Sequence, residues 1–394
     1  MSCVAPPPPG WAPGPLPSPA GPPRTPDLPP RAVDYPQVLR GPRHRWWRPL
    51  ASFVVMVLSF VLVSIVGWAV ALGVVAATGG DPEHWLQDAG SITSEPGGFL
   101  VTNLTLAALV PCAAFAVWLG HGVPGRYLSS VTGRFRWRWF ARCLLVLVPL
   151  WALYVGLGTA ADPPPAGRPQ QWVVLLLVMV LTTPLQCAGE EFAFRGWILQ
   201  SLGSWARHRW VALVLPTVAS CLLFGLAHGS MDPWVMADLS IFAVTACLMT
   251  WRTGGLEAAI ALHCANNMLV MGISLVLGGF DEGFIDQGTT SSPAALVPSL
   301  VMMPIAYALV AWQARRAGIR RRTEPQIPPP PLVWLPEATP GPATPPTTSP
   351  KVLPSQEAVP SQEAVPSQGT PTPPPSGPPA PPAGPDRTTG TGWD

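Results

Sequence analysis

The sequence predicts an all-α membrane protein with about eight transmembrane helices and a disordered, Pro-rich tail at each end. Three observations support this prediction. Only 11% of the 394 residues are charged, whereas about a quarter is typical of soluble proteins. The apolar residues are clustered into runs long enough to cross a bilayer. The 54 Pro residues are concentrated toward the two ends, and this many could not be tolerated in a packed core.

The two ends of the chain have the composition of low-complexity tails. Residues 1–39 are Pro-rich with scattered charge and no apolar periodicity, which favours disorder or a polyproline conformation. Residues 323–394 are similar, and the hexapeptide Pro-Ser-Gln-Glu-Ala-Val occurs twice in succession at 354–365. This repeat predicts plain disorder, with a docking or spacer segment as the alternative.

Eight apolar runs between the tails give the predicted membrane spans. They cover 51–77, 98–119, 140–160, a run that begins near Gln171, 210–228, 233–250, 256–277 and 294–312. A tight turn at 252–255 joins the sixth span to the seventh. The predicted regions are spans one to three with their loops at 40–169, a core of spans four to seven at 170–277, and the last loop, span eight and a basic segment at 278–322.

The charges alternate from one loop to the next. The loops at about 78–97 and directly after 277 contain Asp and Glu but no Lys or Arg, whereas the segments before 51, around 126–142 and after 312 are rich in Arg. The positive-inside rule assigns the Arg-rich segments to the cytoplasm. We therefore expect a multi-pass cell-membrane protein with both termini cytoplasmic. The Arg residues flank helices and form no single basic patch, which argues against a nucleic-acid partner.

The stretch 183–197 has two adjacent carboxylates, Glu190 and Glu191, at the end of an apolar run. A charge in hydrocarbon costs a few kcal/mol or more, so these groups need a polar cavity or a cation. Glu191 and Arg195 are four residues apart and can pair on one helix face. Glu190 points about 100° away and keeps a free carboxylate. The alternative is a Glu pair at a membrane boundary with an ordinary surface Arg.

Further polar residues lie in apolar surroundings on other spans. His228 ends the fifth span in Phe224-x-x-x-His228, while His263 and Asn267 share one face of the seventh. A lone His in a membrane helix most often makes a helix–helix hydrogen bond, but here several packing roles would have to coincide. A carboxylate and an imidazole can deprotonate a water, and a second imidazole with an amide can stabilise an oxyanion.

A metal site is the alternative use of these side chains. Glu190, His228 and His263 would supply three zinc ligands and leave one position open, although the helical H-E-x-x-H pattern is absent. No C-x-x-C pattern occurs, and six of the seven Cys lie in apolar runs, where Cys behaves as a small hydrophobe. The sequence thus requires no cofactor, and zinc is the open alternative.

Three short motifs, in order on successive predicted spans, resemble those of the CPBP family of intramembrane glutamic endopeptidases. That family includes CAAX prenyl proteases and bacteriocin-processing or Abi-like immunity proteins. The resemblance covers about 170–277. The motifs are Glu190-Glu191-x-x-x-Arg195-Gly196, Phe224-x-x-x-His228 and His263-x-x-x-Asn267.

The resemblance implies a role for each motif residue. Glu190 would act as the general base on a water, helped by His228. His263 and Asn267 would stabilise the oxyanion, and the Glu–Arg pair four residues apart would support the site. The expected function is hydrolysis of a peptide bond in a membrane-associated protein or peptide, with membrane lipid as the other partner and the oligomeric state left open. The alternatives are a non-enzymatic immunity or scaffold protein, a zinc-dependent protease, or a transporter that uses Glu and His as a proton relay.

The predicted topology contains one geometric conflict. If the spans cross fully, Glu190 and His263 lie toward the cytoplasmic side, whereas His228 lies near the outer end of its span. A helix of about 18 residues is about 27 Å long, which one water cannot bridge. Either the turn at 229–233 is sunk in the membrane, or the helices tilt around a deep cavity; irregular backbone is tolerated at depth where it lines water or protein.

Overall fold

The computed structural model describes residues 27–87, 95–163, 167–280 and 283–325. These residues contain helices and turns but no β-strand, which confirms the predicted all-α class. Residues 1–26 and most of the predicted C-terminal tail, including the repeat at 354–365, lie outside the described residues.

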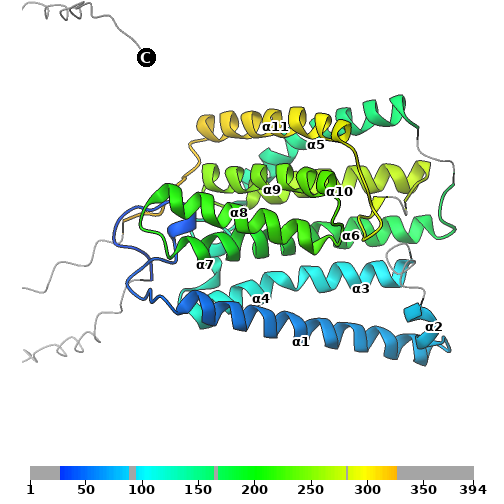
Figure 1. Cartoon of the computed structure of the whole chain (residues 1–394), viewed down its shortest axis with the longest axis horizontal. Helices are drawn as coiled ribbons and strands as arrows, with labels where there is room; N and C mark the ends of the chain where they lie inside the picture. Colours follow the sequence, from blue (N-terminus) through cyan, green and yellow to red (C-terminus); the bar gives the residue numbers. More distant parts are fainter. Residues whose placement is uncertain (1–26, 88–94, 164–166, 281–282, 326–394) are drawn as a thin grey trace, which may run out of the picture. The chain divides into compact units, whose positions relative to one another are not determined.

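Eleven α-helices form the described part of the chain (Figure 1). Their bounds are α1 Arg48–Ala77, α2 Pro82–Gln87, α3 Pro96–Ala107, α4 Leu109–Ala116, α5 Trp137–Ala161, α6 Trp172–Glu191, α7 Leu199–Gly203, α8 Arg209–Ala227, α9 Pro233–Thr253, α10 Glu257–Leu277 and α11 Leu296–Arg316. Short π-helical turns at Val117–His121 and Phe192–Ile198 follow α4 and α6.

Eight helices in the described residues are long and apolar enough to cross a membrane, which matches the predicted number. The second span, Pro96–His121, combines α3, α4 and a π-helical turn, and the fourth, Trp172–Gly203, combines α6, a π-helical turn and α7. The ends differ from the predicted bounds by a few residues, as is usual for helix termini. The sequence does not predict α2.

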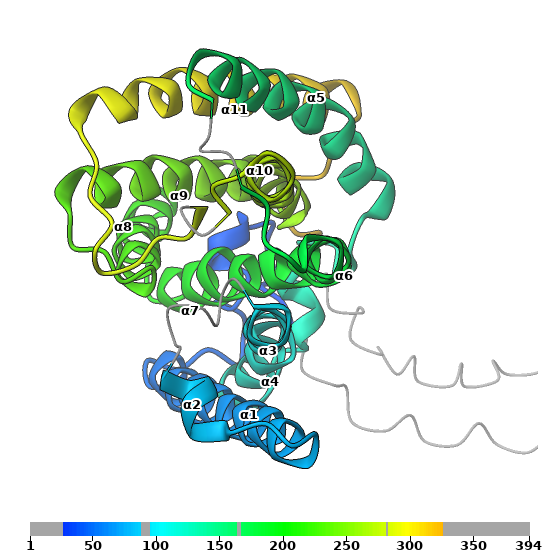
Figure 2. The same ribbon diagram turned by 90° about the vertical axis from the view of Figure 1, so that its right-hand side faces the viewer.

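Helix α10 lies in the middle of the bundle and contacts α5, α6 and α9. Viewed along the helices, α5 and α11 lie on one side of it, whereas α6 and then α3 lie on the other (Figure 2). Helix α1 packs on α4 and is the outermost helix. Because α10 is central, its small and polar side chains face several neighbouring helices at once.

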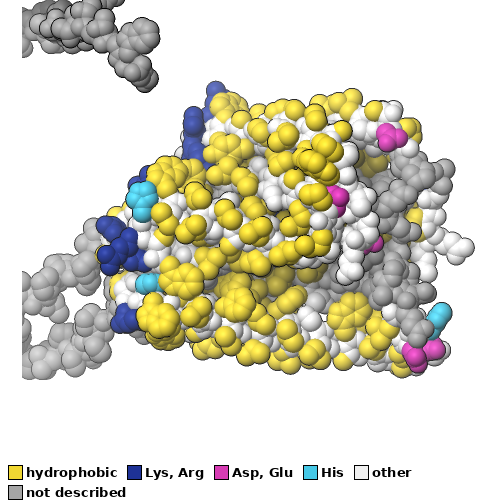
Figure 3. All heavy atoms as spheres, in the orientation of Figure 1, with side chains coloured by type: hydrophobic (Ala, Val, Ile, Leu, Met, Phe, Trp, Pro, Cys, Tyr) yellow, Lys and Arg dark blue, Asp and Glu magenta, His cyan; other side chains and the backbone are white. Residues whose placement is uncertain are grey.

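The outer flanks of the bundle are apolar, and its two ends differ in charge (Figure 3). On α1, Leu58, Leu62 and Ile65 each expose more than half of their surface, as expected for side chains that face lipid. Arg side chains gather at the end where α1 begins, and acidic side chains lie toward the opposite end. We refer to these as the basic end and the acidic end.

Residues 27–39 are packed against the helices, whereas the sequence predicts a tail up to residue 39. Tyr35 and Val38 are fully buried. The Tyr35 hydroxyl donates a hydrogen bond to the Leu128 carbonyl. Burial raises the pKa of Tyr35 well above its ordinary value of 10.0, so the phenol keeps the proton that it donates. This packing was missed because short apolar pieces between Pro residues show no period, and their partners are distant in sequence.

The segment before α1 is also joined to the segment after α11. Val33 and Thr323 exchange two hydrogen bonds of 3.0 Å. The buried Asp34 carboxylate accepts from Arg322 at 2.9 Å and pairs with Arg209 at 3.1 Å. These contacts hold both ends of the bundle's chain at the basic end.

Candidate active site

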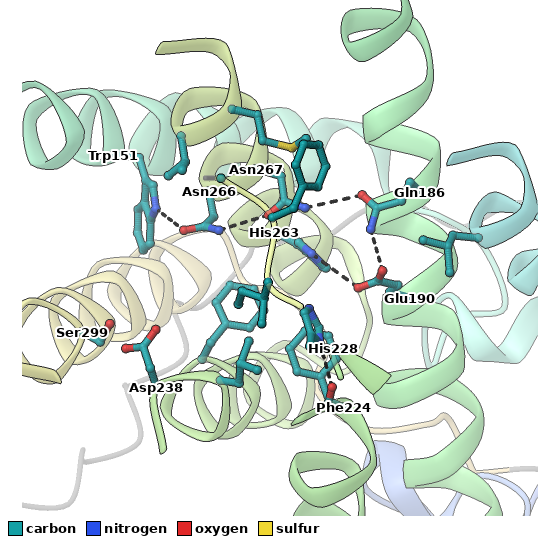
Figure 4. Close-up of a pocket in the computed structure, with 18 of the residues that line it drawn as sticks. Trp151, Gln186, Glu190, Phe224, His228, Asp238, His263, Asn266, Asn267 and Ser299 are labelled. Carbon is teal, nitrogen blue, oxygen red and sulfur yellow. Dashed lines mark hydrogen bonds and ion pairs between the residues drawn. The ribbon is translucent and has the colours of Figure 1, made fainter. Parts of the chain in front are cut away.

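A cavity of about 340 Å³ lies within the bundle, and all four predicted catalytic side chains line it (Figure 4). Glu190 comes from α6, His228 follows the last residue of α8, and His263 and Asn267 come from α10. Residues that are far apart in the sequence therefore meet at one polar site in an apolar bundle.

Glu191 and Arg195 form the ion pair that their spacing predicts. Arg195 Nη1 donates to Glu191 Oε1 at 3.0 Å, and both side chains are completely buried. Neither residue lines the cavity. The pair crosses from α6 into the π-helical turn Phe192–Ile198, a local widening of the helix that is frequent at functional sites.

Aromatic rings enclose the guanidinium of Arg195. Its Cζ lies 4.1 Å from the ring centre of Phe224 and 5.6 Å from that of Phe242, which is within the range of cation–π attraction. Arg195 Nε and Nη2 have no hydrogen-bond partner in the described part of the chain. The first residue of the Phe224-x-x-x-His228 motif therefore shields a buried cation.

The same Phe224 fixes the ring of His228. The Phe224 carbonyl lies 2.7 Å from His228 Nδ1 and, as a carbonyl, can only accept the proton there. His228 is therefore protonated at Nδ1, which leaves the Nε2 lone pair available to the cavity when the ring is neutral. The two motif residues are four apart because the His228 side chain reaches back to the backbone carbonyl of Phe224, one helical turn earlier.

His263 lies between the two adjacent carboxylates. Its Nδ1 donates to Glu191 Oε1 at 2.9 Å, and its Nε2 lies 3.7 Å from Glu190 Oε2. The charges of Glu191 and Arg195 cancel. Arg195 and His263 thus set two basic side chains against the two carboxylates. This balance lets two carboxylates lie side by side in an apolar bundle.

A chain of hydrogen bonds leads to Glu190 across three helices (Figure 4). Each side chain donates to the next, in the order Trp151, Asn266, Asn267, Gln186 and Glu190, at 3.0, 3.1, 3.4 and 2.6 Å. The chain orients the Asn267 amide and occupies Glu190 Oε1. Glu190 Oε2 has no hydrogen-bond partner in the described residues and is left for a ligand.

Among the polar side chains that line this cavity, sequence reasoning missed Gln186, Trp151 and Asp238. Gln186 lies four residues before Glu190, so the same helical spacing that paired Glu191 with its Arg could have revealed it. Asp238 is a single carboxylate inside a predicted span, which is by itself a signal of function. No sequence pattern connects Trp151 with the site.

Helix α6 is held close to α3 beside the Glu pair. A Cβ added to Gly189 would lie 2.0 Å from the Leu106 carbonyl oxygen, so only glycine fits there. One turn away, Asn103 Nδ2 donates to the hydroxyls of Thr182 and Thr183 at 2.8 and 3.1 Å. These contacts fix the position of α6, and with it the position of Glu190.

The turn between α8 and α9 accounts for the position of His228. Ser230 in this turn is fully buried, and its hydroxyl donates to the Thr289 carbonyl at 2.8 Å. The connection from α10 to α11 thus packs on the turn, and its residues Phe284 and Ile285 line the cavity. The depth of this turn in the membrane, and the choice between the two solutions that the sequence leaves open, stay predictions.

The zinc alternative concerns Glu190, His228 and His263. In the described part of the chain, no group of three or more His, Cys, Asp or Glu side chains is arranged to hold a metal ion. Whether these three side chains bind zinc stays a prediction. Cys187 and Cys264 pack in an apolar cluster and do not line the cavity.

Comparison with known proteins agrees with this region. Residues 169–269 match the family model of the type II CAAX prenyl endopeptidase Rce1-like proteins, close to the 170–277 expected from the motifs. The chain is also 23% identical over 239 residues to the uncharacterized protein YyaK of Bacillus subtilis (strain 168), an alignment that covers 57% of this chain and 76% of that relative. No solved structure matches significantly. Residues 169–269 of this multi-pass membrane protein are therefore similar to the Rce1-like type II CAAX prenyl endopeptidases.

Proposed function

We propose that the protein is an intramembrane endopeptidase in which Glu190 activates a water to hydrolyse a peptide bond of a membrane-associated protein or peptide. The observation that carries this proposal is the state of the Glu190 carboxylate. One of its oxygens accepts from Gln186, and the other has no partner in the described residues and lies 3.7 Å from His263 Nε2. A carboxylate held in this way is oriented and still able to accept a proton.

In the proposed reaction, a water binds between Glu190 Oε2 and His228 Nε2. Glu190 takes a proton as the water oxygen bonds to the substrate's carbonyl carbon. The carbon–nitrogen bond then breaks, and Glu190 returns its proton to the leaving amine. The products are a carboxylic acid and an amine, which become a carboxylate and an ammonium group when the acid's proton passes to the amine, and Glu190 is ionised again.

Two groups are placed to stabilise the oxyanion that forms in this step. His263 Nδ1 donates to Glu191 Oε1, and in the imidazolium form, in which both ring nitrogens are donors, its Nε2–H can donate to the oxyanion. Asn267 uses one amide hydrogen for Gln186, which leaves the second for the substrate. Donors that are already oriented before the reaction contribute strongly in a cavity with little water.

The size of the cavity suits a short peptide segment. Its volume of about 340 Å³ lies at the lower end of the range of about 300–1,000 Å³ for ligand sites. Apolar side chains such as Leu106, Phe242 and Met271 line it beside the polar groups. We propose a substrate that presents an apolar segment with one susceptible bond, in a cell membrane that the chain crosses with both termini cytoplasmic.

The test is cleavage of a library of membrane peptides by the purified full-length protein in lipid nanodiscs, with products identified by mass spectrometry. Glu190→Gln keeps the acceptor for Gln186 and removes the base, so turnover should fall about 100-fold or more. Cys187→Ala and Cys264→Ala are the matched controls, because both thiols lie outside the cavity. Loss of cleavage in the Cys variants, with Glu190→Gln still active, would replace the proposed base with a thiol nucleophile. A wild type that binds peptides without cleaving any would favour the immunity or scaffold alternative.

A further inference from the structure

Asp238 is a second carboxylate in the same cavity, and the proposed reaction does not use it. It belongs to α9, inside the sixth membrane span, and lines the cavity with Glu190 and the two His residues (Figure 4). Its Oδ1 is buried and has no hydrogen-bond partner in the described residues. An ionisable group at membrane depth is costly and usually serves function.

In the described part of the chain, no Lys or Arg side chain pairs with Asp238. Its helix neighbours Val235, Leu239 and Phe242 are apolar and buried. Neither Lys nor Arg occurs among the described residues that line the cavity. The guanidinium of Arg195 is paired with Glu191 and lies against the rings of Phe224 and Phe242. The positive charge that would balance Asp238 is therefore expected from a ligand.

The position of Asp238 separates it from the hydrolytic groups. In Figure 4 it projects from α9 on the side of Ser299, whereas Glu190 projects from α6 across the cavity. Tyr154 and Ser299 also line the cavity and supply hydroxyls. A peptide whose susceptible bond lies at Glu190 can thus place a neighbouring side chain at Asp238.

We propose that Asp238 is a specificity-determining residue that binds the positively charged side chain of an Arg or Lys close to the cleaved bond of the substrate. This inference rests on the proposed endopeptidase function. A cation from the peptide would offset the desolvation of the carboxylate, and removing either partner would leave the other unpaired. Charge complementarity of this kind discriminates between substrates more than it raises overall affinity.

The test compares peptides that differ only in one charge. An Arg is placed in turn at each position of an apolar membrane peptide, and each version is matched with citrulline, a neutral isostere of Arg. For the wild type in nanodiscs, kcat/KM should be about tenfold or more higher for the Arg version at one position near the cleaved bond. Asp238→Asn should remove this preference mainly through KM, so that the Arg and citrulline peptides give the same kcat/KM.

Asp286→Asn is the matched control, because it makes the same chemical change at an exposed carboxylate of the α10–α11 connection. It should keep the Arg preference, since Asp286 is absent from the cavity wall. A preference that is lost equally in both variants would reflect general surface charge and would overturn the assignment of Asp238.

Failure of this inference can be told apart from failure of the proposed function. If cleavage depends on Glu190 but the Arg-to-citrulline ratio is the same in wild type and Asp238→Asn, the function stands and the specificity role is refuted. If no peptide is cleaved, calorimetry with the same peptide pairs decides the role. Tighter binding of an Arg peptide by wild type than by Asp238→Asn supports it, and equal binding overturns it.

Discussion

Glu190 and Glu191 are adjacent in the chain but have different surroundings. Glu191 is fully buried and accepts from Arg195 and His263, whereas Glu190 lines the cavity and accepts from Gln186. The angle of about 100° between successive helix residues produces this division. One carboxylate is thus available to hold the site together, and the other is available for a ligand.

The alanine substitutions of Glu191 and Glu190 are therefore expected to lower the stability of the protein by different amounts. Glu191→Ala leaves the Arg195 guanidinium and His263 Nδ1 without their acceptor in a buried setting, so we expect a loss of about 3–5 kcal/mol of stability. Glu190→Ala removes the acceptor of Gln186 and a carboxylate that lies 3.7 Å from His263 Nε2, both at the wall of the cavity, so the loss should be much smaller. Thermal unfolding of both variants in nanodiscs measures the difference. A Glu190→Ala variant that is the less stable of the two would contradict the roles assigned here.

The contacts within one helix were predictable at this scale, whereas those between helices were not. Spacing alone predicts that Glu191 meets Arg195 and that His263 shares a face with Asn267. The link from Trp151 to Asn266 joins α5 to α10, and no local pattern encodes which faces of two helices meet. The chain of donors to Glu190 therefore became visible only in the structure.

At the scale of the helix, α6 combines close packing with local irregularity. Pro184 lies within it, and it ends in the π-helical turn that carries Arg195. Gly189 lets its backbone approach α3 beside the Glu pair. The features that depart from a regular helix are thus gathered where the site is built.

Gly189→Ala should separate α6 from α3. The new methyl group would lie 2.0 Å from a backbone oxygen of α3, and we expect a loss of about 1–3 kcal/mol of stability from overpacking. Peptide cleavage should also fall, because Glu190 moves with α6. Gly156→Ala on α5 is the matched control, since its Cβ would have no neighbour within 4 Å and alanine is the better helix former. Unfolding and cleavage assays on both variants test this; equal effects would show that the close approach is unimportant.

Apolar run length was sufficient to predict eight spans, because crossing the bilayer sets a minimum length for each helix. The two π-helical turns and the packed segment 27–39 were not predictable in this way. Both depend on tertiary contacts, such as the burial of Tyr35 beneath Leu128. The turn at 252–255 was predictable, since Gly254 takes a positive φ of 66° that favours glycine.

On the scale of the whole bundle, its first and last described segments lie together. The hydrogen bonds between Val33 and Thr323 and the ion pairs of Asp34 join them at the basic end. A chain that begins and ends on one side must cross an even number of times, which agrees with the eight apolar helices. Contacts and hydropathy thus lead independently to the same topology.

This topology predicts where inserted reporters will be exposed. Gly80 follows α1 at the acidic end, and Glu324 follows the pairing of Thr323 with Val33 at the basic end. The excess of Arg at the basic end predicts that this end faces the cytoplasm. Alkaline phosphatase, which is active only outside the cytoplasm, should therefore be active after Gly80 and inactive after Glu324. A fluorescent protein that matures in the cytoplasm should give the reverse pattern. If both sites report the same side with either reporter, the number of crossings between them is even, and the eight-span arrangement with both ends in the cytoplasm is wrong.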